Sequence, residues 1–146
     1  MTVVHTFHAL AFIENFSLKE LAQHFPEAKR QYHQLSYPAG AGGAVFLFSF
    51  GVVIFFDVGQ AGREGELLRL RSAPSVMRDA QVISEEFTVR EQSGARPDVE
   101  DGVLVVDTLT PERASMVALT VAQSAAMDRR HGILGANRRS DVRRHR

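Results

Sequence analysis

The chain has 146 residues, of which 45% are apolar and 23% are charged, and it contains no cysteine. These values are typical of a single soluble domain with its own core, and the lack of cysteine excludes disulfides, thiolate metal sites and cysteine nucleophiles. The net charge is zero, but residues 1–128 carry 10 Lys and Arg against 16 Asp and Glu, whereas residues 129–146 carry seven Arg against one Asp. The body is therefore acidic and the C-terminal segment is basic.

The first 30 residues predict a strand and a helix. Residues 3–13 are mostly apolar and β-rich, which indicates a strand. Residues 1–16 show no cationic region, no long apolar region and no small-residue cleavage site of a secretory signal. Ser17, followed three residues later by Glu20, forms a capping box. This pattern predicts a helix that begins at Leu18 and ends near Pro26. With no signal sequence, we expect a cytoplasmic protein.

A short strand is expected over residues 31–37, and a loop over residues 38–43, which hold three Gly and one Pro. The glycine cluster lacks the Lys and the Ser or Thr of a phosphate-binding loop, and it leads into a strand rather than a helix. We therefore expect an ordinary connection at this place and no bound cofactor.

A run of thirteen uncharged residues, AVFLFSFGVVIFF, extends from Ala44 to Phe56 and holds five of the ten phenylalanines. It is too short to span a bilayer, which needs about 20 apolar residues, and its Phe, Val and Ile favour strands. Gly51 predicts a fold-back between a strand over 44–50 and a strand over 52–58. One long strand with a bulge at Gly51 is the alternative.

The second half of the chain is expected to hold two helices and two strands. Thr110 as N-cap and Pro111 at the first helical position indicate where the last helix begins. Its larger and polar residues lie along one side (Met116, Leu119, Thr120, Gln123 and Met127), with alanines elsewhere. The elements are a helix over 61–71, a strand over 80–91, a loop over 92–101, a strand over 102–109 and a helix over 110–130.

The expected order of elements is β-α-β-β-β-α-β-β-α. Strands that follow one another closely pair as hairpins, so this order predicts an α+β two-layer sandwich with a mostly antiparallel sheet and helices on one face. Residues 1–130 form one domain in this interpretation. Residues 131–146, with no periodicity and few apolar groups, are expected to form a disordered, Arg-rich tail.

No catalytic or metal-binding pattern is apparent in the sequence. His5 and His8 belong to no HExxH motif and have no acid at ligand spacing, so no metal site is expected. No serine lies in a GxSxG or SxxK motif. Asp57 and Glu86 are the candidate acid–base residues if the protein is an enzyme, although such carboxylates are usually solvated. We therefore expect a protein without catalysis.

The arginine-rich tail is the one charge feature typical of a binding segment. Basic segments bind nucleic acid or anionic lipid by neutralising phosphates. The absence of interleaved aromatic residues for base stacking favours a solvated terminus instead. The candidate nucleic-acid contacts are Arg138, Arg139, Arg143 and Arg144.

The apolar hairpin and the last helix together resemble one known family. The hairpin reads FLFSFGVVIF over residues 46–55, and the helix contains VAQS over residues 121–124. Both are similar to motifs of the required-for-meiotic-nuclear-division family, also described as Sad1-interacting factors, over roughly residues 3–130. Relatives are linked to meiosis or mitochondrial translation and continue into long helices, often with a membrane segment. No catalytic residue is established for the family, so the resemblance implies no active site.

These observations predict an interaction or scaffold domain that self-associates and can bind a protein partner. If helices cover only one face of an apolar sheet, the other face is exposed and forms an interface. Gln123 and Ser124 are expected to make specific hydrogen bonds, either in the core or to a partner. The alternative is an RNA- or ribosome-associated factor that binds through the tail. The candidate interaction residues are Gln123, Ser124, Phe46, Phe48 and Phe55.

Overall fold

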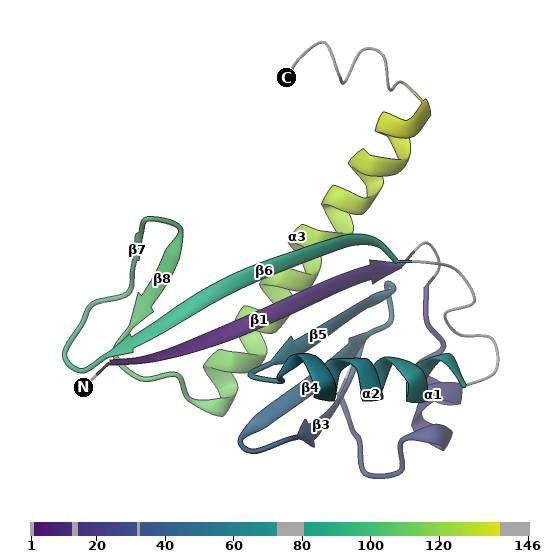
Figure 1. The fold of residues 1–146 in the computed structure, drawn as a ribbon, viewed down its shortest axis with the longest axis horizontal. Helices are drawn as coiled ribbons and strands as arrows, with labels where there is room; N and C mark the ends of the chain where they lie inside the picture. Colours follow the sequence, from purple (N-terminus) through teal and green to yellow (C-terminus); the bar gives the residue numbers. More distant parts are fainter. Residues whose placement is uncertain (1, 13–14, 32, 73–80, 138–146) are drawn as a thin grey trace.

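The computed structural model describes residues 2–12, 15–31, 33–72 and 81–137. These residues form a mixed α+β fold in which helices pack on an open, mostly antiparallel sheet, as the sequence predicts (Figure 1). The strands are β1 (Thr2–Phe12), β2 (Lys29–Gln31), β3 (Gln34–Ala39), β4 (Gly43–Phe48), β5 (Val52–Phe56), β6 (Gln81–Gln92), β7 (Asp98–Glu100) and β8 (Val103–Val106). The helices are α1 (Leu18–His24), α2 (Gln60–Arg71) and α3 (Pro111–Asn137).

The eight strands lie in the order β2-β3-β4-β5-β1-β6-β8-β7. β1 lies near the middle and pairs antiparallel with β5 on one side and with β6 on the other. The one parallel pair in this sheet is β6 with β8. The outermost strands, β2 and β7, have three residues each, all of them exposed. Neither was expected, because β2 (Lys-Arg-Gln) has no apolar residue and β7 (Asp-Val-Glu) has one, too few to show an alternating pattern.

The predicted fold-back at Gly51 is confirmed. β4 and β5 pair antiparallel, and the three residues between them form the turn. Gly51 has a φ of 87°, and its N–H donates to the carbonyl oxygen of Phe48 over 3.0 Å. A turn followed by a residue in the left-handed region matches the right-handed twist of the strands, and glycine adopts that conformation at little cost.

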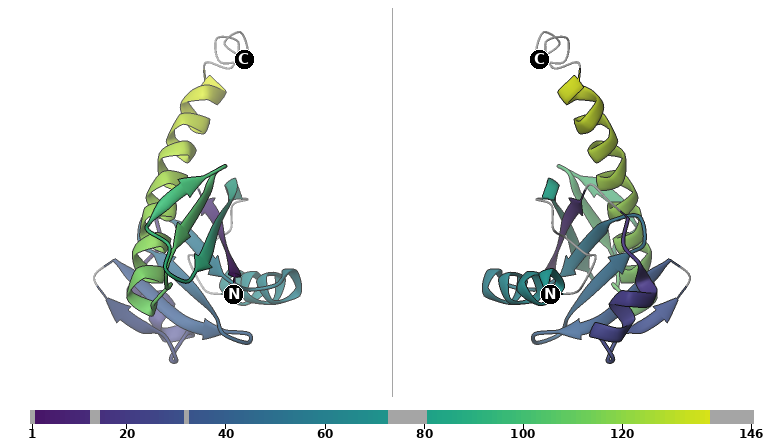
Figure 2. Two further views of the ribbon diagram at one scale, coloured as in Figure 1. Left: turned by 90° about the vertical axis from the view of Figure 1, so that its left-hand side faces the viewer. Right: turned by 90° about the vertical axis from the view of Figure 1, so that its right-hand side faces the viewer.

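Helices cover both faces of the sheet, whereas one covered face was expected (Figure 2). On β5, Val53 and Phe55 point into the core beneath α1 and α2, and Val52 and Ile54 point into the core beneath α3. The hairpin is apolar on both sides, so each side needs its own cover. The expected interface on a bare face of this hairpin is therefore wrong.

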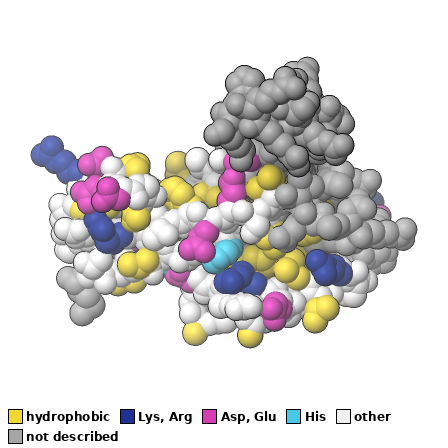
Figure 3. All heavy atoms as spheres, turned by 45° about the horizontal axis from the view of Figure 1, so that its top comes forward, with side chains coloured by type: hydrophobic (Ala, Val, Ile, Leu, Met, Phe, Trp, Pro, Cys, Tyr) yellow, Lys and Arg dark blue, Asp and Glu magenta, His cyan; other side chains and the backbone are white. Residues whose placement is uncertain are grey.

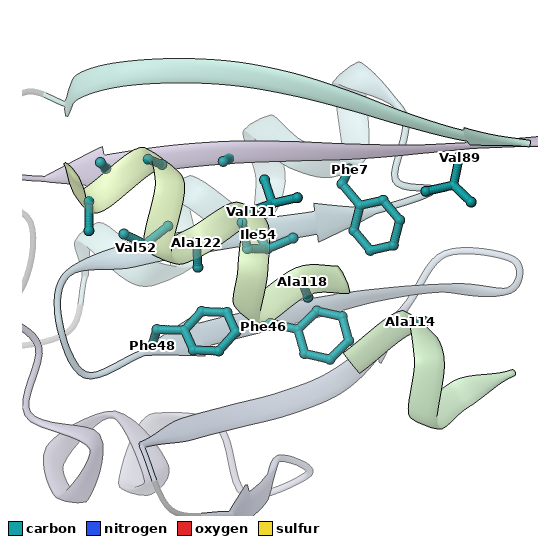
Figure 4. Packing of buried hydrophobic residues seen from close by; sticks show 14 of the residues in the cluster. Phe7, Phe46, Phe48, Val52, Ile54, Val89, Ala114, Ala118, Val121 and Ala122 are labelled. Carbon is teal, nitrogen blue, oxygen red and sulfur yellow. The ribbon is translucent and has the colours of Figure 1, made fainter. Parts of the chain in front are cut away.

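α3 packs on the sheet through its small residues (Figure 4). Ala118 and Ala122 are fully buried against the face that carries Phe46 and Phe48. The larger side chains of Met116, Leu119 and Met127 are exposed. Small residues let the helix axis approach the sheet closely, and the phenylalanines fill the space between them. The buried positions of α3 are Ala114, Ala118, Val121, Ala122, Ala125 and Ala126.

Both helix starts predicted from the sequence are confirmed. The hydroxyl of Ser17 accepts a hydrogen bond from the N–H of Glu20 at 3.4 Å, and that of Thr110 accepts one from the N–H of Arg113 at 3.2 Å. The end of α3 was predicted near Arg130, but the helix continues to Asn137. Its C-terminal half extends past the end of the sheet (Figure 1).

Replacement of Ala122 by Leu tests the close packing of α3. The larger side chain has no space at this buried position, so we expect Ala122→Leu to lower the free energy of unfolding by about 1–3 kcal/mol. The matched control is Ala61→Leu at an exposed position of α2, which should change it by less than about 0.5 kcal/mol. Urea unfolding followed by circular dichroism measures both variants. Equal stability of the two would contradict the close packing.

Candidate functional site

His5, in the N-terminal half of β1, lies between two carboxylates. Its Nδ1 is 2.5 Å from Oδ2 of Asp57, and its Nε2 is 3.2 Å from Oε2 of Glu91. Burial lowers the pKa of His5, but the hydrogen bonds and charges of Asp57 and Glu91 outweigh it, so the net shift is upward. An imidazolium that donates from both nitrogens fits this geometry, because both carboxylates accept.

The other oxygen of each carboxylate accepts a backbone N–H. Oδ1 of Asp57 accepts from Thr6 at 2.9 Å, and Oε1 of Glu91 accepts from Leu109, just before α3. Asp57 follows β5 in the left-handed region, with a φ of 53°, a conformation in which Asp is enriched. This cluster of His5, Asp57 and Glu91, the histidine clamp, therefore ties β1, β5, β6 and the approach to α3 together.

Sequence reasoning missed the histidine clamp, since no acid lies near His5 along the chain. Asp57 and Glu91 are 52 and 86 residues away. They reach His5 because β1 pairs with β5 and with β6, which places Glu91 opposite Val3 and Val89 opposite His5. Both ring nitrogens and all four carboxylate oxygens have partners, so the arrangement stabilises the fold rather than offering a free acid or base.

A cavity of 860 Å³ lies beside the histidine clamp, between the N-terminal turns of α3 and the sheet. Phe46 and Phe56 line it, together with polar side chains of β3 and α3. The amide of Gln34 donates to the hydroxyl of Ser115 over 3.4 Å, which joins β3 to α3 across the cavity.

A second hollow, the α3 groove, runs between α3 and strands β6 and β8 and has a volume of 680 Å³. Its lining is mainly apolar, and Glu85 and Glu86 add acidic groups. On the face shown in Figure 3, hydrophobic side chains form small patches between acidic and basic side chains. The apolar lining of the α3 groove consists of Phe87, Leu104, Met116, Val117 and Val121.

Two carboxyl groups meet at the α3 groove. The side chain of Glu85 on β6 hydrogen-bonds to Asp128 on α3, and burial together with this contact raises the pKa of Glu85 to about 7. One proton between two carboxyls allows this hydrogen bond, whereas two negative charges at this distance repel. The next residue, Glu86, also lines the groove and pairs with His8 on β1 at 2.9 Å.

Most residues singled out from the sequence are placed by the structure. Phe46, Phe48 and Phe55 lie in the core and not at the surface. Gln123 and Ser124 are exposed, so the alternative that places their hydrogen bonds in the core is wrong, and contact with a partner stays a prediction. The candidate nucleic-acid contacts Arg138, Arg139, Arg143 and Arg144 lie outside the described residues.

Asp57 and Glu86, the acid–base residues of the enzyme alternative, each contact a different histidine. They therefore belong to separate sites on the sheet and do not converge. Within the described residues, no group of three or more His, Asp or Glu side chains is placed to hold a metal ion. No helix in that same part of the chain is long and apolar enough to cross a membrane.

No protein-family model, curated protein or solved structure matches this chain. The resemblance to the required-for-meiotic-nuclear-division family stays a prediction. The residues that carry it have different locations: the hairpin is buried beneath helices, whereas Gln123 and Ser124 are at the surface.

Removal of the His5 charge should lower stability in a pH-dependent way. The folded-state pKa of His5 is raised above 6.5, so the stabilisation is complete below pH 6.5 and is lost as pH rises through the folded-state pKa. We expect His5→Gln to lower the free energy of unfolding by about 1–3 kcal/mol at pH 6 and by less at pH 9. Denaturant unfolding at both pH values measures the difference. An exposed control, His33→Gln, should show no such trend.

The contribution of the Glu85–Asp128 contact to stability should also decrease as the pH rises. The pKa of Glu85 is raised from 4.5 to about 7, so its contribution to stability is present below pH 4.5 and is lost as pH rises to about 7. We expect Glu85→Gln to raise the melting temperature at pH 8 by about 2–4 °C and to change it little at pH 4.5. The exposed Glu64→Gln on α2 is the control. A Glu85→Gln effect that is equal at both pH values would contradict the assignment.

Proposed function

We propose that this protein is a non-catalytic interaction domain that self-associates through the outer side of α3. The observation that carries this proposal is the orientation of the helix. Its alanines face the sheet, while Met116 is 69%, Met127 59% and Leu119 38% exposed. Large apolar side chains in one region of a surface, beside an apolar groove, are typical of interaction sites.

The α3 groove adjoins this surface and extends it. Met116 belongs to both, and Phe87 and Leu104 continue the apolar lining onto the sheet. Methionine adapts its shape to a partner because its side chain is unbranched and flexible, and contact surfaces are enriched in it. Gln123 and Ser124 lie within the same region of α3 and supply polar contacts.

Pairing of the ionisable groups supports a function without catalysis. His5 contacts Asp57 and Glu91, and His8 contacts Glu86, so the candidate acids and bases are engaged in contacts within the fold. The resemblance to the required-for-meiotic-nuclear-division family agrees with this proposal, since no catalytic residue is established for that family. A cytoplasmic location is part of the same proposal.

Sedimentation equilibrium of the full chain tests self-association. We expect a dimer whose dissociation constant rises about tenfold or more in the double variant Met116→Glu, Met127→Glu, because buried charge opposes association. The matched control is Leu68→Glu, which is equally exposed but lies on α2, on the opposite face of the sheet. A monomer at all concentrations would remove the proposal. A monomer that binds RNA with a steep salt dependence would favour the alternative, in which residues 131–146 are the binding segment.

A further inference from the structure

We propose that the cavity beside the histidine clamp binds a small carboxylic acid with an aromatic body. The carboxylate of this ligand lies at Lys29, near the edge of the sheet, and its aromatic body lies over Phe46, towards the centre of the sheet. This function is additional to the proposed self-association, which uses the outer side of α3. The volume of the cavity, 860 Å³, is within the range of about 300–1,000 Å³ that is typical of ligand sites.

One row of paired residues in the cavity changes from charged to apolar. Lys29 on β2 lies opposite Ser36 on β3, and Ser36 lies opposite Phe46 on β4. All three residues line the cavity. Phe46 belongs to the core beneath α3 (Figure 4), and residues opposite one another in an antiparallel pair share a face, so the whole row lies on the α3 side. From the edge of the sheet inwards, the row therefore presents an ammonium, a hydroxyl and an aromatic ring.

A second row of the cavity is wholly apolar. Pro38 on β3 lies opposite Ala44 on β4, and Ala44 lies opposite Phe56 on β5. These three residues line the cavity together with Ala114, which belongs to the first turns of α3. Apolar groups of the sheet and of the helix thus both contribute to the wall. Such a wall buries the body of a ligand, and contact with the ring of Phe46 favours an aromatic body.

The charges around the cavity favour a ligand with one negative charge. The carboxylates of Glu27 and Glu91 form ion pairs with Arg69 and His5, at 2.7 and 3.2 Å. Among the described residues that line the cavity, Lys29 is then the one cation without a carboxylate partner. A single ammonium matches a carboxylate, whereas a phosphate dianion would need further cations.

Uncharged hydrogen-bond donors accompany Lys29. Ser36 lies directly opposite it, and Gln31, two residues along β2, points to the same face of the sheet. One carboxylate oxygen can accept from the ammonium and the other from the hydroxyl or the amide. The remaining acidic residue of the lining, Glu112, lies in the first turn of α3, where the helix dipole favours a negative charge.

An NMR titration of the full chain with 3-phenylpropionate at pH 7 tests the site. We expect saturable shifts of amide signals from β3, β4 and the first turns of α3, and binding of the uncharged 3-phenylpropionamide that is weaker by about tenfold or more. Lys29→Gln should weaken binding of the acid by about tenfold or more, because a hydrogen bond from a charged donor is lost. Lys29 is exposed, so the variant should fold normally.

Arg30→Gln is the matched control. It removes the same charge from the next residue of β2, but Arg30 lies opposite Leu35, which belongs to the core beneath α1 and α2. Arg30 therefore points away from the cavity, and its replacement should change the affinity by less than about twofold.

Binding of the acid that is lost in Lys29→Gln and kept in Arg30→Gln supports the proposal. Equal loss in both variants would overturn it, since this result indicates attraction by overall charge without a defined site. Equal affinity for the acid and the amide would also overturn it, as would shifts confined to the α3 groove or the absence of saturable shifts. None of these results changes the outcome of sedimentation, so the site and the proposed self-association are tested separately.

Discussion

The fold depends on a hairpin that must be covered on both sides. The side chains of β4 and β5 that face the two cores are apolar on both sides of the sheet, and those of β1 beside them are apolar on both sides from Ala9 to Phe12. A strand pair of this kind has no side that water can solvate without loss of free energy. The chain meets this constraint with α1 and α2 on one face and with α3 on the other. The remaining strands extend the sheet from this centre.

Close contact on the α3 side determines what the outer surface looks like. Phe7, Phe46 and Phe48 fill the sheet face, so the helix that lies on them needs small residues there. Alanine meets that need, and the larger residues of the helix are left on the solvent side. The surface on which the proposed dimer depends is thus a consequence of the core, because a helix with leucines facing inward would not fit over these phenylalanines.

Local signals in the sequence predicted local structure correctly. Ser17 and Thr110 mark helix starts because their hydroxyls accept backbone N–H groups a few residues away, and Gly51 marks a turn that needs a positive φ. The histidine clamp was not predictable in this way, since its members meet only through the pairing of β1 with β5 and β6. The burial of alanines rather than methionines on α3 was not predictable from local signals either, because it depends on the phenylalanines of the sheet that face the helix. The end of α3 was predicted near Arg130, just before Gly132, but a single glycine costs only about 1 kcal/mol in a helix and does not by itself end it.

The two outermost strands restrict how copies of this protein meet. Lys29 and Arg30 lie on β2, and Asp98 and Glu100 lie on β7, so the open sheet has a basic border at one end and an acidic border at the other. Two copies of β2, or two copies of β7, carry charge of the same sign and repel one another. A β2 strand beside a β7 strand has only three residues over which to form hydrogen bonds. Lateral growth of the sheet into fibres is thereby suppressed even though its centre consists of uncharged, aromatic strands. A protein can then retain an uncharged, aromatic hairpin at its core without exposing a long sheet edge on which further strands could add.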